Sequence, residues 1–203
     1  MSFDIEKKSM PERFQHLLKL IKSRRFLDMQ GLGNEIPFYI CPFKPEESVE
    51  MEKTRKNLTI NLMQAGVKVC EVNLYDISIS LIKERNIWEN IIENEQTFNK
   101  TDLMEMFEGI LDAKTYIIPN IINKVNEKEC NAVFISGVGE VFPYIRSHNI
   151  LENLQSAVKT KPVILFFPGS YIHSIEHGAS MSLFRKLSDY KYYRAFNIYH
   201  CEI

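Results

Sequence analysis

Short apolar runs alternate with amphipathic stretches along this chain, a pattern that predicts strands separated by helices. Strands that are apolar throughout are typical of a parallel sheet with both faces covered. The segments expected to form strands are 36–41, 67–75, 132–138, 163–169 and 192–200. We therefore predict a single α/β domain over residues 1–203, with three layers: a mostly parallel sheet between two layers of helices.

The first helix is marked by its capping residues. Ser9 and Glu12 have the spacing of a capping box, and Pro11 falls in the first turn. These signals, with the apolar stripe that follows, predict an N-terminal helix over 10–25. A polar helix is expected over 47–64, because Gly66 then interrupts the pattern.

The stretch 77–125 contains more helix than one connection between two strands requires. Asp76 and Thr101 are the expected N-caps of its helices. Pro119 lies inside an apolar rhythm, so it implies a kink or a division into two shorter helices. We expect a helical insertion that stands out from a Rossmann-like or degenerate nucleotide-binding-like domain.

Composition and charge narrow the function classes. The chain has 25 Lys and Arg against 26 Asp and Glu, a net charge of −1, which argues against a dedicated nucleic-acid binder. Its apolar runs are far shorter than the roughly 20 residues that span a bilayer. The mixed-charge start MSFDIEKKSM has no apolar core of a secretory signal. We expect a cytoplasmic protein with no membrane contact.

The basic cluster Lys22, Arg24 and Arg25 has two interpretations: a solvated helix end, or a nucleic-acid contact assisted by the aromatic strand 192–200.

The spacing of the cysteines does not indicate a metal site. They stand at 41, 70, 130 and 201, too far apart for the close ligand pairs of zinc sites, so we expect reduced thiols.

Two glycine-bearing turns suggest a phosphate cradle, and neither completes one. GLGNE (31–35) precedes a strand, the wrong order for a strand–loop–helix cradle. SGVGEVFP (136–143) has the right order, with Gly137 and Gly139 able to take positive φ. Phe142 stands where the third glycine of a dinucleotide fingerprint belongs, and no lysine follows.

The pentapeptide HSIEH (173–177) matches the pattern of inverted zinc peptidases. On a helix, His173 and His177 would share a face, with Glu176 as the base. A third ligand is still required, and Asp189 and Glu202 are the only later acids. The surroundings indicate a loop, so we expect a chance match and no metal.

The carboxyl ends of the predicted parallel strands are the expected place for a binding site. A Ser-His-Asp triad is not indicated, because no serine stands in a G-x-S-x-G turn. The strand ends would hold either a hydrogen-bonded lattice or a crevice for a partner or small ligand. Residues expected at this edge are Asn73, Asp76, Gly139, Glu140, Arg146, His148, Pro168 and Gly169.

Several motifs together resemble the BrxB family, a core component of BREX bacteriophage-exclusion systems. The most specific is SGVGEVFPYIRSHNILENLQ (136–155). The others are GLGNEIPFYI (31–40), EVNLYD (71–76), FFPG (166–169) and YYRAFNI (192–198). The resemblance runs from about residue 10 to residue 200 and is least distinct before residue 30 and over 170–191.

The resemblance implies a small bacterial protein in an assembly with a DNA methyltransferase, a large ATPase and the alkaline-phosphatase-like protein PglZ. It implies binding to PglZ and other BREX proteins, contact with DNA only through the complex, and no established catalytic activity. We expect a non-catalytic adaptor without a cofactor, and self-association stays open. The alternatives are a nucleotide-binding or enzymatic module that uses the 136–149 turn, and a DNA-binding accessory subunit.

The candidate site residues are charged or polar groups at turns, where loops on a rigid scaffold commonly carry contacts. Gly137 and Gly139 form the candidate ligand turn. The residues assigned to partner binding or to organising turns are Asn34, Glu35, Asp76, Glu140, Arg146, His148 and Arg194.

Overall fold

The computed structural model describes residues 5–30, 37–174, 178–184, 187–190 and 195–202. Within them, strands in the order β2-β3-β4-β1-β7 run parallel to their neighbours, and a hairpin, β5 and β6, continues antiparallel from the far half of β4. The strands are β1 Phe38–Phe43, β2 Val69–Asn73, β3 Ala132–Ser136, β4 Val163–Ser174, β5 Gly178–Leu183, β6 Leu187–Tyr190 and β7 Phe196–Asn197.

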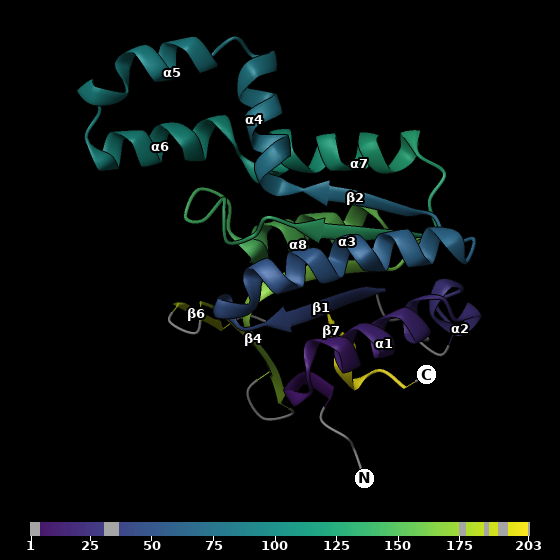
Figure 1. Cartoon of the computed structure of the whole chain (residues 1–203). Helices are drawn as coiled ribbons and strands as arrows, with labels where there is room; N and C mark the ends of the chain where they lie inside the picture. Colours follow the sequence, from purple (N-terminus) through teal and green to yellow (C-terminus); the bar gives the residue numbers. More distant parts are fainter. Residues whose placement is uncertain (1–4, 31–36, 175–177, 185–186, 191–194, 203) are drawn as a thin grey trace.

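Helices occupy both faces of this sheet (Figure 1). The α-helices are α1 Met10–Ile21, α2 Arg24–Leu27, α3 Ser48–Gln64, α4 Leu74–Glu84, α5 Trp88–Asn94, α6 Lys100–Ile110, α7 Ile118–Glu127 and α8 Ser147–Ala157. A π-helical turn, η4, spans Ala113–Ile117. The 3₁₀ turns are η1 Ile5–Lys7, η2 Pro45–Glu47, η3 Glu95–Thr97 and η5 Ile198–His200.

Each face of the sheet has its own core, because successive strand residues point to opposite sides. On β4, Leu165 and Phe167 pack with α4, α7 and α8, whereas Ile164 and Phe166 pack with α1 and α3. All of Val163–Phe167 is buried, as expected for a strand paired on both sides. The predicted three-layer α/β fold is confirmed.

The N-terminal segment forms two helices and not the single helix expected over 10–25. The first ends at Ile21, and Ser23 Oγ accepts a hydrogen bond from the Phe26 backbone N–H at 3.2 Å to begin α2. Arg24 and Arg25 therefore belong to the short helix α2 and not to α1, which ends at Ile21 before them. The Glu12 carboxylate does accept from the Ser9 backbone N–H at 3.2 Å, as one half of the expected capping box.

Two other expected caps are wrong by two or three positions. Asn73, not Asp76, caps α4: its Oδ1 accepts from the backbone N–H groups of Tyr75 and Asp76. Asn99, not Thr101, caps α6 in the same way. In both cases asparagine competes well at the N-cap and stands slightly earlier in the chain.

The C-terminal third departs most from expectation. The strand expected over 192–200 is only Phe196–Asn197 within the described residues, and a 3₁₀ turn follows. The fourth strand continues beyond Gly169 into the unforeseen β5–β6 hairpin. His173 therefore lies on a strand, which removes the helical spacing that the HSIEH match requires; residues 175–177 lie outside the described part.

The described residues contain no group of three or more His, Cys, Asp or Glu side chains placed to hold a metal ion. Across the same residues, no helix is long and apolar enough to cross a bilayer.

The long helical segment between β2 and β3 divides into four helices. Pro119 stands in the first turn of α7, directly after the π-helical turn, which fits the division that its position implied. Helices α5 and α6 lie away from the sheet and project beyond it (Figure 1). We call residues 88–112, which include both, the helical arm.

Replacing Phe167 tests the central position of β4. Its side chain is fully buried, so Phe167→Ala is expected to lower the free energy of unfolding by about 3 to 5 kcal/mol. Ile172→Thr serves as the control on the same strand, because Ile172 is 61% exposed, and is expected to cost less than about 1 kcal/mol. Urea denaturation followed by circular dichroism measures both. Equal losses would contradict this account of the core.

Candidate functional site

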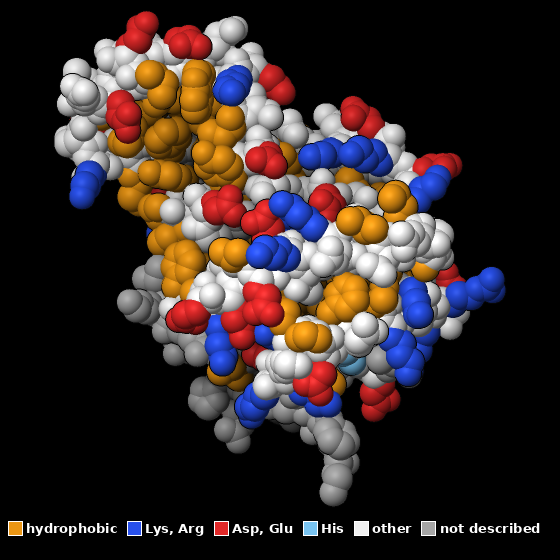
Figure 2. All heavy atoms as spheres, in the orientation of Figure 1, with side chains coloured by type: hydrophobic (Ala, Val, Ile, Leu, Met, Phe, Trp, Pro, Cys, Tyr) orange, Lys and Arg blue, Asp and Glu red, His pale blue; other side chains and the backbone are white. Residues whose placement is uncertain are grey.

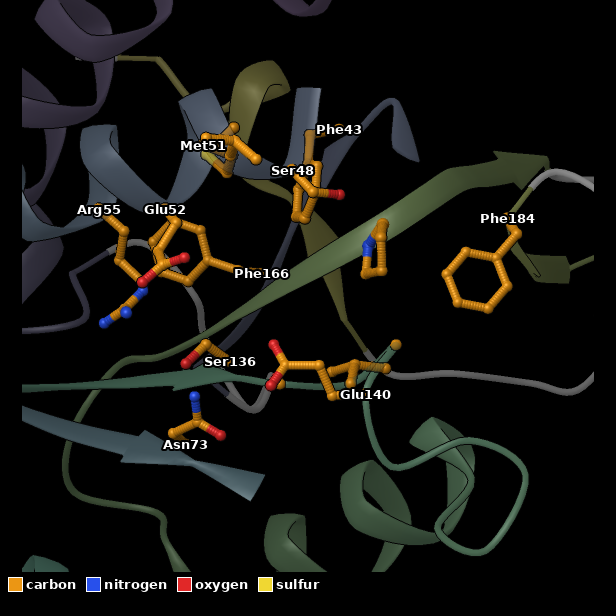
Figure 3. A pocket seen from close by; sticks show the side chains of 15 residues that line it. Phe43, Ser48, Met51, Glu52, Arg55, Asn73, Ser136, Glu140, Phe166 and Phe184 are labelled. Atoms are coloured by element: carbon orange, nitrogen blue, oxygen red, sulfur yellow. The ribbon is translucent and has the colours of Figure 1, made fainter. Parts of the chain in front are cut away.

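A pocket of about 410 Å³ opens at the carboxyl edge of the parallel strands (Figure 3). Its walls come from the ends of β1 to β4, the loop after β3, the start of α3 and the turn after β5. The lining residues are Phe43, Ser48, Val49, Met51, Glu52, Arg55, Asn73, Ser136, Gly137, Val138, Gly139, Glu140, Phe166, Pro168 and Phe184. The site is thus a hollow in which apolar side chains lie beside several polar and charged groups.

The loop after β3 approaches β2 so closely that glycine is required at its start. Gly137 has φ +80°, and a Cβ there would lie 2.5 Å from the Asn73 Oδ1 that caps α4. Gly139 is tight as well, since a Cβ would meet Pro168 and the Phe184 ring at 3.0 to 3.1 Å. These glycines serve the close packing of the pocket wall.

The wall contributed by α3 contains a buried arginine held by an ion pair. Arg55 Nη1 lies 2.8 Å from Glu71 Oε1, and Thr59 Oγ1 donates to the same carboxylate oxygen at 2.5 Å. Glu52, one turn before Arg55, pairs with the exposed Lys56 at 2.6 Å, and the hydrogen bond from Lys56 lowers the pKa of Glu52. Figure 3 shows Glu52 and Arg55 together beside Phe166.

Glu140 is an acidic residue of the pocket whose pKa is raised. Partial burial raises the pKa of Glu140, the negative charges of Glu52 and Asp76 raise it further, and Arg55 opposes them. The folded protein therefore resists a full negative charge at this position. A cation brought by a partner would relieve that repulsion.

The same electrostatics disfavour a phosphate group. The pocket carries the carboxylates of Glu52 and Glu140, while its one lining arginine, Arg55, is already paired with Glu71. The backbone N–H groups at the start of α4 are taken by Asn73, and α8 begins only at Ser147. The Gly137–Gly139 turn thus lacks the helix N-terminus that a phosphate cradle uses.

The structure gathers part of the predicted set at this edge. Gly137, Gly139 and Glu140 line the pocket, and Asp76 lies close enough to influence Glu140. Arg146, exposed, and His148, buried, stand at the start of α8 and do not line the pocket. Asn34, Glu35 and Arg194 lie outside the described residues.

Two parts of the pocket wall, α3 and the hairpin, were not predicted from the sequence. Ser48, Glu52 and Arg55 belong to a helix that follows β1, so its start must lie at the carboxyl edge; that order was the available signal. Phe184 lies in the turn after β5 and lines the pocket. Its place was not predicted, because the β5–β6 hairpin was not predicted.

Comparison with known proteins identifies the family of this chain. A family model described as BREX protein BrxB matches residues 70–198. A BREX protein BrxB of Bacillus cereus is 32% identical over 197 residues, covering 92% of this chain and 96% of its own length. The chain belongs to the BrxB family. A BREX protein BrxB of Escherichia coli is 27% identical and covers 92% of this chain and 90% of its own length.

No solved structure matches the chain. Membership in BrxB makes the chain a bacterial component of BREX phage defence, as the motifs around 136–155 implied. The segment that matches the family model contains Asn73, the Gly137–Glu140 loop and the helical arm, whereas α3 precedes it.

Gly137 provides a test of the pocket wall. Gly137→Ala is expected to destabilise the protein by about 1 to 3 kcal/mol, because alanine is strained at positive φ and its Cβ would meet the Asn73 cap. Gly109→Ala is the control: this glycine lies in α6 with open space around it, and alanine there is expected to stabilise by about 0.5 to 1 kcal/mol. Thermal unfolding distinguishes them. A stable Gly137→Ala variant would refute the close approach.

Glu140 and Glu52 should respond to pH with opposite signs. The raised pKa of Glu140 means that its charge disfavours the folded state above that pKa, and that this effect is absent below the ordinary glutamate pKa of about 4.3. Glu140→Gln is therefore expected to raise Tm relative to wild type at pH 7, with the gain vanishing near pH 3.5.

Glu52→Gln is expected to lower Tm at pH 7, because the lowered pKa of Glu52 contributes stability that is lost as pH falls. Differential scanning calorimetry across this range measures both variants. The same sign for the two variants at pH 7 would contradict the electrostatics described for the pocket.

Proposed function

We propose that this BrxB-family protein is a non-catalytic adaptor that docks PglZ and so supports host DNA methylation and phage restriction by the BREX system. The observation that carries the proposal is the open pocket at the carboxyl edge, where apolar side chains and charged groups lie together. Its lining includes Val49, which is 69% exposed, and Tyr75 beside Asn73 is 46% exposed. Exposed apolar side chains around a hollow are a common feature of protein interfaces.

The charges at this edge suggest how a partner would be oriented. Glu140, Glu52 and Asp76 favour a Lys or Arg side chain from the partner, as the raised pKa of Glu140 indicates. Arg146 is exposed at the start of α8, and its guanidinium makes no ion pair or hydrogen bond within the described residues. A guanidinium in that state suits a bidentate contact with a carboxylate of the partner.

The first test is co-expression with PglZ, followed by size-exclusion chromatography with light scattering. The proposal expects a complex of defined stoichiometry that survives dilution to micromolar concentration. Separate elution at micromolar concentration and low salt would contradict it. Salt-dependent binding of the isolated protein to DNA would favour the accessory DNA-binding alternative instead.

Arg146 gives a sharper test of the docking edge. Arg146→Ala is expected to weaken PglZ binding by about tenfold or more, which corresponds to about 1.4 kcal/mol, with no change in Tm. Arg24→Ala is the matched control, since Arg24 is an exposed arginine on α2, and it is expected to bind as wild type does. Isothermal titration calorimetry measures all three proteins. Wild-type affinity of Arg146→Ala would remove this residue from the interface.

A further inference from the structure

Helix α6 of the helical arm is amphipathic, yet none of its apolar side chains is completely buried. Leu103, Met106, Phe107 and Ile110 on α6 follow the spacing of one helical face, and each is only half-buried. No residue of α6 is fully buried. A helix of a globular domain ordinarily covers such a stripe, so this one is incompletely covered by its own chain.

The neighbouring helix adds to the same apolar surface. On α5, Ile91 is buried, Trp88 is half-buried, and Ile92 is 53% exposed. Lys83 Nζ lies 5.1 Å from the centre of the Trp88 ring. Figure 2 shows hydrophobic side chains gathered over the α5–α6 region, with acidic side chains around their margin.

The net charge of the helical arm is opposite in sign to that of the rest of the chain. Residues 88–112 contain seven carboxylates and a single lysine, a net charge of −6, whereas the rest of the chain carries 24 Lys and Arg against 19 Asp and Glu, a net charge of +5. Within the described residues, its five glutamates are exposed and form no ion pair. They are Glu89, Glu93, Glu95, Glu105 and Glu108.

The arm is fixed to the domain at two places. Arg85 Nη1 donates to the Ile110 carbonyl at 2.9 Å, and its guanidinium lies 4.2 Å from the centre of the Tyr116 ring. Phe107 packs on Tyr144 with ring centres 4.8 Å apart, which ties α6 to the loop whose first part lines the pocket. These contacts hold the arm, and the surface that it presents, in a defined position on the domain.

From this combination we propose that the helical arm is a docking surface for a basic amphipathic helix of a partner protein. The half-buried stripe of α6 and the exposed side of α5 receive the apolar face of that helix. The unpaired glutamates meet its lysines and arginines, which favours basic segments and excludes acidic ones. The inference deepens the proposed adaptor function, on which it rests, by naming the surface and the kind of segment it takes.

The chain offers its own probe for this contact. Trp88 is the single tryptophan, so tryptophan fluorescence, excited selectively over the tyrosines, reports on the arm alone. The ligand is a synthetic Lys/Leu peptide of about 18 residues, roughly five helical turns, with leucines on one face. There are two control peptides. One has the same composition with the leucine positions scrambled, and the other keeps the leucine positions but has glutamate in place of each lysine.

Binding of the basic amphipathic peptide is expected to shift Trp88 emission to shorter wavelength, with an affinity that falls as salt rises. The scrambled and acidic peptides are expected to bind at least about tenfold more weakly. No change in Trp88 emission, or equal affinity for the three peptides, would overturn the proposal.

A pair of charge reversals locates the contact. Glu105→Lys with Glu108→Lys, both exposed on α6, is expected to reduce peptide affinity at least about tenfold. Glu127→Lys with Glu152→Lys makes the same change of charge at exposed positions on α7 and α8 and is expected to retain affinity within about twofold. Circular dichroism confirms that both variants fold. Equal losses would show that only overall charge matters and would overturn the proposal.

The same proteins mixed with purified PglZ separate this inference from the adaptor function. If the arm variant alone loses PglZ, both stand. If wild type and both variants bind PglZ, and the basic amphipathic peptide binds no more tightly than its two controls, the adaptor function stands and the arm proposal falls. If PglZ never binds but the peptide occupies the arm, the arm stands and the PglZ assignment falls. A wild-type dimer that the arm variant makes monomeric would identify a second copy as the occupant and overturn the proposal.

Discussion

The pairing of β4 between β1 and β3 is the constraint on which the rest of this structure depends. Five consecutive buried residues, Val163–Phe167, leave neither face of that strand available to water. Helices must therefore cover both faces, and parallel neighbours require long connections that return to the same end of the sheet. The ends of β1 to β4 consequently meet at one edge, and the pocket lies there.

The parts of the fold set by local pattern could be predicted from the sequence. The buried strands are runs of apolar residues, so their existence and the layering of helices on both sides followed from composition and period alone. Strand order could not be obtained this way, because pairing of β1 with β4 depends on contacts between segments more than 120 residues apart. The hairpin of β5 and β6 was missed for a different reason: β5 alternates Ala179, Met181 and Leu183 with Ser180 and Ser182, but it contains no β-branched or aromatic residue. The four residues of β6, LSDY, show no alternation.

The same distinction applies to the candidate site. Asn73, Gly139 and Pro168 were expected at the strand ends and all line the pocket, because position along a parallel strand predicts the edge at which a residue lies. The buried state of Arg55 had no counterpart in the pattern of a polar helix, since it depends on Glu71 and Thr59. The predicted N-caps of α4 and α6 were wrong by a few positions for a simpler reason. Several residues that can cap a helix stand close together in the chain, and the three-dimensional geometry decides which of them does so.

The link between Arg85 and Ile110 gives the molecule a modular character. It closes the base of the arm with one hydrogen bond from the end of α4 to the end of α6, so the chain leaves and re-enters the domain at nearly the same place. An inserted element with closely spaced ends can change in length or sequence without disturbing the sheet. Members of one family can therefore diverge in the surface that this element displays while the core around β4 stays the same.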